Sequence, residues 1–150
     1  MIKIEYLKKF PEHLNTVVGW VYPEWWHNRC SFEEVVELYR TLLNDRFLPI
    51  AIIAFKDGVP AGTALICKDD PDIKEGVSPW LEGLFVCKEF RMCGIGTALV
   101  ARIETIAMDV GYDSLYLSSG LDGFYQELNY SAIKKLENGD TLFEKSLVGV

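Results

Sequence analysis

A strand-like run that ends in a two-glycine turn is the part of the sequence best suited to chemistry. Trp80 to Val86 is apolar apart from Glu82 and predicts a buried strand, and residues 95–110 have the periodicity of a helix. Between them lie residues 91–96 (RMCGIG), whose glycines allow the backbone to approach a ligand closely. The first N–H groups of a helix have no internal acceptors and carry the positive end of its dipole. This turn therefore predicts a binding site for a phosphate group.

Two well-known phosphate-binding motifs do not fit this turn. The sequence has no GxxxxGK string followed by Ser or Thr, which excludes a P-loop. A dinucleotide fingerprint needs a third glycine, and Leu99 stands in its place. The pyrophosphate loop of acetyl-CoA enzymes needs Gln or Arg, two free positions, Gly, one free position, and Gly or Ala. Arg91, Gly94 and Gly96 match it, although three fixed positions alone leave a plain strand-to-helix turn as an alternative.

The surrounding sequence resembles the GNAT superfamily of N-acetyltransferases. Residues 78–99 resemble its strand–loop–helix core, and residues 123–130 (GFYQELNY) resemble its FYxxxG segment that ends in an aromatic residue. One helix and one strand fit between the two segments, and the element order from residue 2 to residue 148 fits the same fold. Lys88 and Met92 stand where many members have proline and glycine, and Asn129 replaces a glycine. Met92 keeps its N–H, and asparagine tolerates the left-handed conformation that glycine would supply.

The resemblance implies acetyl-CoA as the acyl donor. A backbone N–H near Phe85 or Val86 would polarise the acetyl carbonyl. The residues that the resemblance assigns to the cofactor are Leu84, Phe85, Val86, Arg91, Met92, Cys93, Gly94, Ile95, Gly96 and Thr97. A solvated surface charge is the alternative for Arg91.

Amide formation needs a neutral amine, and an amine with a pKa of ~10.4 is neutral in about one molecule in a few thousand at pH 7. Glu82 interrupts an apolar strand, and strand alternation predicts that Trp80, Glu82 and Leu84 share one face. Several GNAT enzymes have a carboxylate at or beside this position, so the resemblance implies that Glu82 is the general base, directly or through water. An exposed strand edge or a paired structural carboxylate is the alternative. The resemblance also implies that Tyr125 protonates the leaving thiolate, with a core aromatic as the alternative.

Two groups of residues could shape the acceptor site. The aromatic candidates are Tyr22, Trp25, Trp26 and Trp80, of which the first three lie between the first two helices. The acidic run consists of Asp69, Asp70, Asp72 and Glu75. The aromatics could equally belong to the core, and the acidic run could be a solvated loop. A net charge of −7 and aromatic faces suit a cationic amine, so we expect a small-molecule amine rather than a protein as acceptor.

The pattern of elements predicts an α/β chain. Strands are expected at residues 2–8, 48–55, 61–67, 80–86 and 114–117, with two more between 130 and 148. Helices are expected from Pro11 to Pro23, from the capping box at Ser31 to Asp45, and at residues 95–110 and 123–128. With the resemblance, this predicts a GNAT-like fold with a mixed, mostly antiparallel sheet of about six to seven strands and about four helices. We expect residues 1–150 to form a single domain.

Composition excludes several classes of function. The negative net charge argues against nucleic-acid binding, and no apolar run reaches the ~18 residues of a membrane span. The first residues lack a signal-peptide core, which predicts a cytoplasmic protein. The four cysteines form no CxxC pair, so we expect no metal site, and no nearby histidine activates Cys93 as an acyl carrier. The sequence allows a homodimer. Besides a small-amine acetyltransferase, it leaves open a peptide acetyltransferase and a non-catalytic acyl-CoA-binding regulatory domain.

Overall fold

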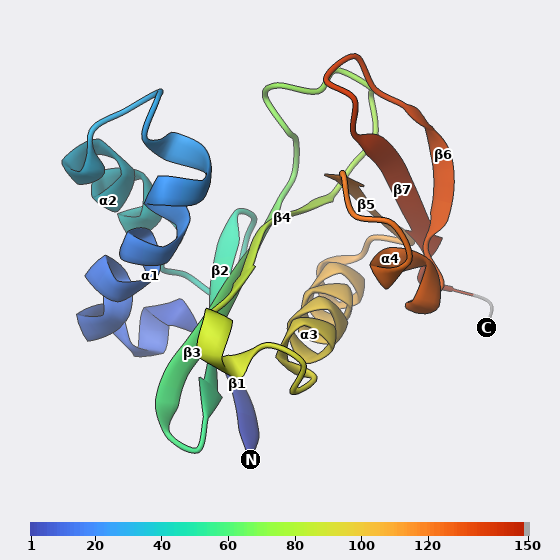
Figure 1. Cartoon of the computed structure of the whole chain (residues 1–150). Helices are drawn as coiled ribbons and strands as arrows, with labels where there is room; N and C mark the ends of the chain where they lie inside the picture. The colour runs from blue at the N-terminus through green and yellow to red at the C-terminus, as the bar shows by residue number, and fades with distance from the viewer. Residues whose placement is uncertain (149–150) are drawn as a thin grey trace.

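The computed structural model describes residues 1–148, which form one seven-stranded sheet with helices on both faces (Figure 1). The strands are β1 (Ile2–Tyr6), β2 (Ile50–Lys56), β3 (Val59–Cys67), β4 (Trp80–Val86), β5 (Ser114–Ser119), β6 (Ser131–Lys135) and β7 (Thr141–Ser146). Their order in the sheet is β1-β2-β3-β4-β5-β7-β6. All neighbouring pairs are antiparallel except β4 and β5, which confirms the predicted mixed, mostly antiparallel sheet.

Four α-helices cover the sheet. They are α1 (Leu14–Val21), α2 (Phe32–Arg40), α3 (Ile95–Val110) and α4 (Phe124–Glu127). Short 3-10 turns occupy Leu7–Lys9, Pro11–His13 and Lys88–Phe90, and a π-helical turn occupies Tyr22–Trp26. Helices α1 and α2 lie on one side of the sheet in Figure 1, and α3 lies on the other.

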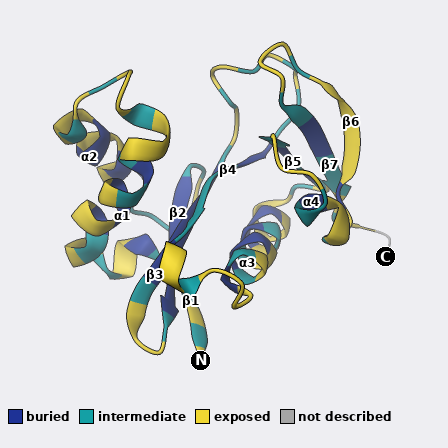
Figure 2. Cartoon of the chain, in the orientation of Figure 1, coloured by how far each residue is buried: buried dark blue, intermediate teal, exposed yellow. Residues whose placement is uncertain are grey.

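The apolar run of β2 reflects burial on both faces of the sheet. Ile50, Ile52 and Ala54 belong to the core beneath α3, here called the α3-side core. The intervening residues Ile53 and Phe55 belong to the core beneath α1 and α2, here called the α1–α2-side core. A strand covered on both faces has no polar alternation, which is why this segment reads as a continuous hydrophobic run. Figure 2 shows β2 buried and β6 exposed along its length.

Several expected boundaries were wrong. The first strand ends at Tyr6 rather than Lys8, because the chain turns into a 3-10 helix there. Pro23 does not stop the first helical segment, since α1 ends at Val21 and the π-helical turn Tyr22–Trp26, which contains Pro23, follows it directly. The second helix ends at Arg40 rather than near Asp45.

The parallel strands β4 and β5 touch at only one register position. Trp80 pairs with Tyr116, and the Tyr116 N–H donates to the carbonyl of Pro79 over 3.0 Å. Figure 1 shows the two strands diverging from this point, with α3 crossing on one side of the sheet. The sheet therefore opens between β4 and β5, next to the turn that leads from β4 into α3.

Candidate active site

The turn before α3 presents backbone donors. Met92 and Gly94 have left-handed φ values of 66° and 86°, and Gly94 is the N-cap residue of α3. No side chain caps this helix, and the Ala98 N–H to the Gly94 carbonyl, at 3.0 Å, is the first bond of the helical ladder. The N–H groups of the first turn thus have no partner within the helix. Such a turn fits an anionic pyrophosphate group.

Gly96 sits where α4 approaches the start of α3. A Cβ atom at this position would lie 3.4 Å from Cζ of Phe124 and 3.8 Å from Cγ2 of Val86. A β-branched side chain would add methyl groups to this already filled contact. The second position of the motif therefore has room for a Cβ but for little more, in keeping with the Gly or Ala that the motif accepts there, whereas the first glycine is needed for its backbone conformation.

Arg91 braces the turn against the end of β4. Its Nε donates to the carbonyl of Val86 over 2.9 Å, and its guanidinium lies 5.8 Å from the ring centre of Phe85. The side chain is exposed and lies beside the turn. This position suits attraction of an anion, with the backbone amides as the nearer donors.

A β-bulge at Gly83 changes which residues of β4 share a face. Gly83 has a φ of +59°, and the pairing of β3 with β4 shifts register there. Glu82 lies opposite Leu65, which belongs to the α1–α2-side core, whereas Leu84 packs against the α3-side core. The prediction that Glu82 and Leu84 share a face was wrong, because the extra residue inverts the alternation. A bulge also leaves backbone polar groups unpaired in the middle of the strand.

Glu82 lies in a small cluster of titratable groups. Its neighbours include Asp70 from the loop before β4 and Cys67 at the end of β3, both within hydrogen-bonding reach. Burial, and after it the proximity of Asp70, raises the pKa of Glu82 to about 9. Burial also raises the pKa of the Tyr39 hydroxyl, and the nearby Glu82 adds to this effect. Glu82 is thus protonated at neutral pH in the protein alone.

Tyr125 is enclosed by aromatic rings. Its ring centre lies 4.8 Å from that of Phe124, 5.8 Å from that of Tyr130 and 5.7 Å from that of Phe143. Only 5% of the residue is exposed. Desolvation by burial raises the pKa of its hydroxyl to about 12. The hydroxyl therefore carries its proton throughout the physiological range. Asn129, which precedes Tyr130 at the end of this segment, adopts the left-handed conformation with a φ of 73°.

The aromatic acceptor candidates fall into different environments. Tyr22 donates its hydroxyl to the carbonyl of Cys30 over 2.7 Å, which fastens the π-helical turn to the start of α2. Trp25 is 45% exposed, and Trp26 carries the guanidinium of Arg29 at 5.5 Å from its ring centre. Trp80 is 1% exposed, so it supports β4 from within and offers little surface to a ligand.

Sequence reasoning missed Trp20. Its ring stacks on that of Phe85, with centres 6.0 Å apart and planes at 18°. Both residues pack against the α1–α2-side core, which is also the face on which Glu82 lies opposite Leu65. Trp20 follows Val17 by three residues, and that helical spacing was the signal that could have placed it near the inner face of α1.

Known families and structures agree with this geometry. Residues 14–130 match the model of the Acetyltransferase (GNAT) family, so the chain belongs to this family. No curated protein sequence matches the chain.

The fold is similar to that of several solved acetyltransferases. An aminoglycoside 6'-N-acetyltransferase complexed with coenzyme A superimposes with a TM-score of 0.77 at 18% identity, over 99% of this chain and 98% of that chain. An aminoglycoside 6'-acetyltransferase type Ii gives 0.75 at 22% identity, over 99% of both chains. An N-acetyltransferase from Staphylococcus aureus Mu50 gives 0.77 at 17% identity, again over 99% of both. At these identities the likeness establishes the fold.

Among residues 1–148, none of the helices combines the length and the apolar character needed to cross a membrane. The same residues contain no group of three or more His, Cys, Asp or Glu side chains arranged to hold a metal ion.

Proposed function

We propose that this protein is an acetyl-CoA-dependent N-acetyltransferase that transfers the acetyl group directly to the primary amine of a small cationic metabolite. The observation that carries the proposal is the uncapped start of α3, formed by Gly94 in a left-handed conformation beside the charge of Arg91. This turn follows β4, the strand that holds Glu82, so a donor site and a proton acceptor belong to one continuous segment.

The chain's own residues fit the pyrophosphate of the cofactor. The amides of Cys93 to Thr97 would hold the phosphate oxygens, and Arg91 would add a positive charge. Met92 exposes its whole side chain, so the left-handed backbone at this position places no bulk inside the turn. Acetyl-CoA supplies an activated acyl thioester when bound. The bulge at Gly83 would leave backbone N–H groups of β4 free to polarise the acetyl carbonyl.

Glu82 would take the proton of the acceptor amine. A carboxylic acid with a pKa of about 9 accepts no proton at neutral pH, so the role requires its ionisation first. A cationic amine placed beside Glu82 and Asp70 favours the charged carboxylate and lowers this pKa. The acidic cluster would therefore become an effective base only when a cation occupies it.

Tyr125 would stabilise the leaving thiolate. Its hydroxyl is protonated at every physiological pH because burial raises its pKa to about 12. Complete transfer of this proton to a thiolate, whose conjugate acid has a pKa of about 8.5, is unfavourable. The hydroxyl acts instead by donating a hydrogen bond to the developing negative charge.

A small cationic acceptor is favoured by charge. Asp70, and to a lesser degree Asp72, contributes to the raised pKa of Glu82. Asp72 is ion-paired with Arg29 over 3.1 Å, so Asp70 is the residue that supports a cation beside Glu82. Two of the structurally similar enzymes act on aminoglycosides, which are small polyamines, and this supports the same acceptor class. A peptide amine is the second candidate, because the exposed Trp25 and the acidic loop could also face a basic peptide.

A panel of acceptors tests the proposal. Release of free thiol from acetyl-CoA is measured with polyamines, amino-sugars and amino acids, and in parallel with basic peptides of matched charge. We expect thiol release with at least one small amine, accompanied by a rise in Tm when acetyl-CoA is present. Thiol release with peptides, together with no thiol release with any small amine, would contradict a small amine as the acceptor. A rise in Tm without any turnover would favour a non-catalytic acyl-CoA-binding domain.

A further inference from the structure

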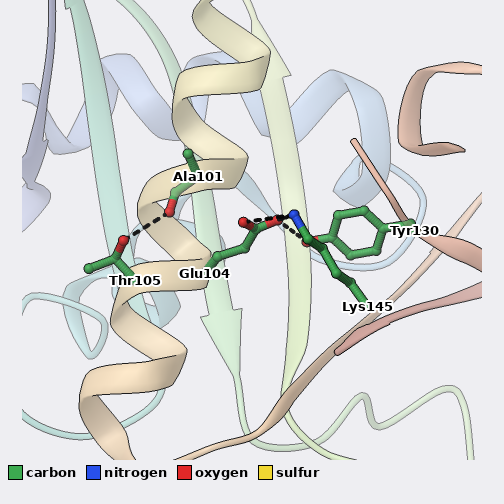
Figure 3. Close-up of polar contacts among 5 residues, drawn as sticks. All are labelled: Ala101, Glu104, Thr105, Tyr130 and Lys145. Atoms are coloured by element: carbon green, nitrogen blue, oxygen red, sulfur yellow. Dashed lines mark hydrogen bonds and ion pairs between the residues drawn. The ribbon is translucent and has the colours of Figure 1, made fainter. Parts of the chain in front are cut away.

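A partly buried polar network lies behind the aromatic rings that surround Tyr125. Glu104, halfway along α3, accepts a hydrogen bond from the Tyr130 hydroxyl over 2.7 Å and from Lys145 Nζ over 3.1 and 3.2 Å. Figure 3 shows the side chains of Tyr130 and Lys145 converging on the Glu104 carboxylate. The Glu104 side chain is 15% exposed and that of Lys145 is 22% exposed, while Tyr130 is almost fully buried.

The network joins two parts of the fold that the sheet connects weakly. Glu104 belongs to α3, which packs mainly against β3 and β4. Tyr130 and Lys145 belong to the part of the chain beyond the β4–β5 junction, where the sheet has one register pair. The ion pair therefore ties the helix whose first turn would hold the cofactor to the segment that carries Tyr125.

Tyr130 links this tie to Tyr125. The two rings meet edge to face at 5.8 Å and 75°, and the Tyr130 N–H donates to the Tyr125 carbonyl over 3.0 Å. Lys145 Nζ lies 5.5 Å from the centre of the Tyr130 ring. Three residues thus contact Tyr130. Glu104 accepts the hydrogen bond of its hydroxyl, Lys145 lies over its ring, and the ring of Tyr125 packs against it in a T-shaped arrangement. Helix α4 has only four residues, so it depends on such contacts for its position.

We propose that Glu104 is a positioning residue for the transfer reaction, which acts through Tyr130 to fix the hydroxyl of Tyr125 relative to the first turn of α3. This inference rests on the proposed function, in which Tyr125 donates to the leaving thiolate. A hydrophobic side chain would satisfy packing between α3 and β7 equally well. A carboxylate that receives directed bonds from two residues fixes orientation as well as separation.

Variants of the network separate positioning from folding. Glu104→Leu removes both bonds, Tyr130→Phe removes only the hydroxyl, and Glu104→Gln keeps an oxygen that accepts from Tyr130. Thr105→Ala is the matched control, because Thr105 is the next residue of α3 and bonds only within the helix, to the Ala101 carbonyl over 3.2 Å (Figure 3). Tyr130→Phe also serves if Glu104→Leu fails to fold.

The expected result is a split between kcat and KM. Glu104→Leu and Tyr130→Phe lower kcat about tenfold, because a small misplacement of a reacting group is costly. The KM for acetyl-CoA stays within about twofold of the wild type, since the first turn of α3 is intact. Glu104→Gln recovers most of the loss, and Thr105→Ala behaves as wild type. Unchanged kcat in both Glu104→Leu and Tyr130→Phe, or an equal loss of cofactor binding, would overturn the inference.

A second readout does not depend on turnover. 3-Fluorotyrosine is incorporated at position 125, and its ¹⁹F NMR resonance is compared among the variants. We expect one narrow line in wild type and Thr105→Ala, and a shifted or broadened line in Tyr130→Phe. An unchanged line in Tyr130→Phe would refute positioning of Tyr125. If the wild-type protein acetylates no amine, the proposed function fails, and the ¹⁹F spectrum still decides whether Glu104 and Tyr130 fix Tyr125.

Discussion

The carboxyl group of Glu82 lies close enough to that of Asp70, a residue twelve positions earlier in the chain, for Asp70 to add to the effect of burial in raising the pKa of Glu82. Two carboxyl groups this close cannot both be ionised without mutual repulsion, and partial burial adds to that effect. The cluster therefore holds a proton at neutral pH that a cationic ligand can displace. Protein stability, the reaction rate and the preference for a cationic acceptor should all depend on whether this proton is bound.

Replacing Glu82 by Gln should stabilise the protein, and more so as pH rises. The pKa of Glu82 lies at about 9 in the folded protein and near 4.5 in the unfolded chain. A group with a raised folded pKa stabilises fully below the unfolded value, and its contribution is lost as pH rises towards the folded value. Glutamine mimics the protonated form at all pH values. The Tm difference between Glu82→Gln and wild type should grow by roughly 10 °C from pH 6 to 9, and a constant difference would contradict the raised pKa.

The rate should depend on the same ionisation. For the free enzyme, kcat/KM should rise with pH along a limb centred near the pKa of Glu82, about 9. Asp70→Asn removes the neighbouring charge and should move this limb to lower pH by about one unit. Asp69→Asn, on the adjacent residue, is the control. pH profiles of the three proteins check the prediction, and an identical limb in Asp70→Asn would assign the base elsewhere.

Cofactor binding should be lost when Gly94 is replaced by a residue that cannot adopt its left-handed backbone conformation. Gly94→Val places a β-branched residue at a φ of 86°, which costs about 1–2 kcal/mol and misdirects the amides. Gly19→Ala is the matched control, because a Cβ at Gly19 meets nothing within 4 Å on helix α1. The acetyl-CoA-dependent rise in Tm should vanish in Gly94→Val and persist in Gly19→Ala. Retention of the full shift by a folded Gly94→Val protein would exclude this turn as the phosphate site.

Tyr125→Phe should affect chemistry rather than binding. The ring contacts remain while the donor to the thiolate is removed, so kcat should fall about a hundredfold with little change in KM for acetyl-CoA. Steady-state kinetics with a series of acceptors measure both constants. Wild-type kcat in Tyr125→Phe would return Tyr125 to the role of a core aromatic.

Local patterns predicted much of the fold. The capping box at Ser31 is confirmed, with Glu34 N–H donating to the Ser31 hydroxyl over 3.1 Å and Ser31 N–H donating to Glu34 over 2.9 Å. Gly111 ends α3 in a left-handed conformation, which is common for a glycine directly after a helix. These features depend on neighbouring residues alone, so the sequence contains all the information they need.

The site was less accessible to sequence reasoning. The strand–turn–helix motif was visible because its residues are contiguous, but the bulge at Gly83 arises from pairing with β3 and reverses the face of Leu84. The contact of Glu82 with Asp70 and that of Glu104 with Tyr130 join separate segments. Hydrophobic periodicity carries no information about such polar contacts, because they depend on how the loop and the helix pack.

The most direct test of the central claim is the stoichiometry of transfer. Purified protein is incubated with acetyl-CoA and the best small amine of the acceptor panel, and acetylated amine and free coenzyme A are quantified together by mass spectrometry. Direct transfer by this site predicts one acetylated amine for each coenzyme A released, with no release when the amine is omitted. Coenzyme A release that does not depend on the amine, or the absence of any acetylated amine, would contradict the account.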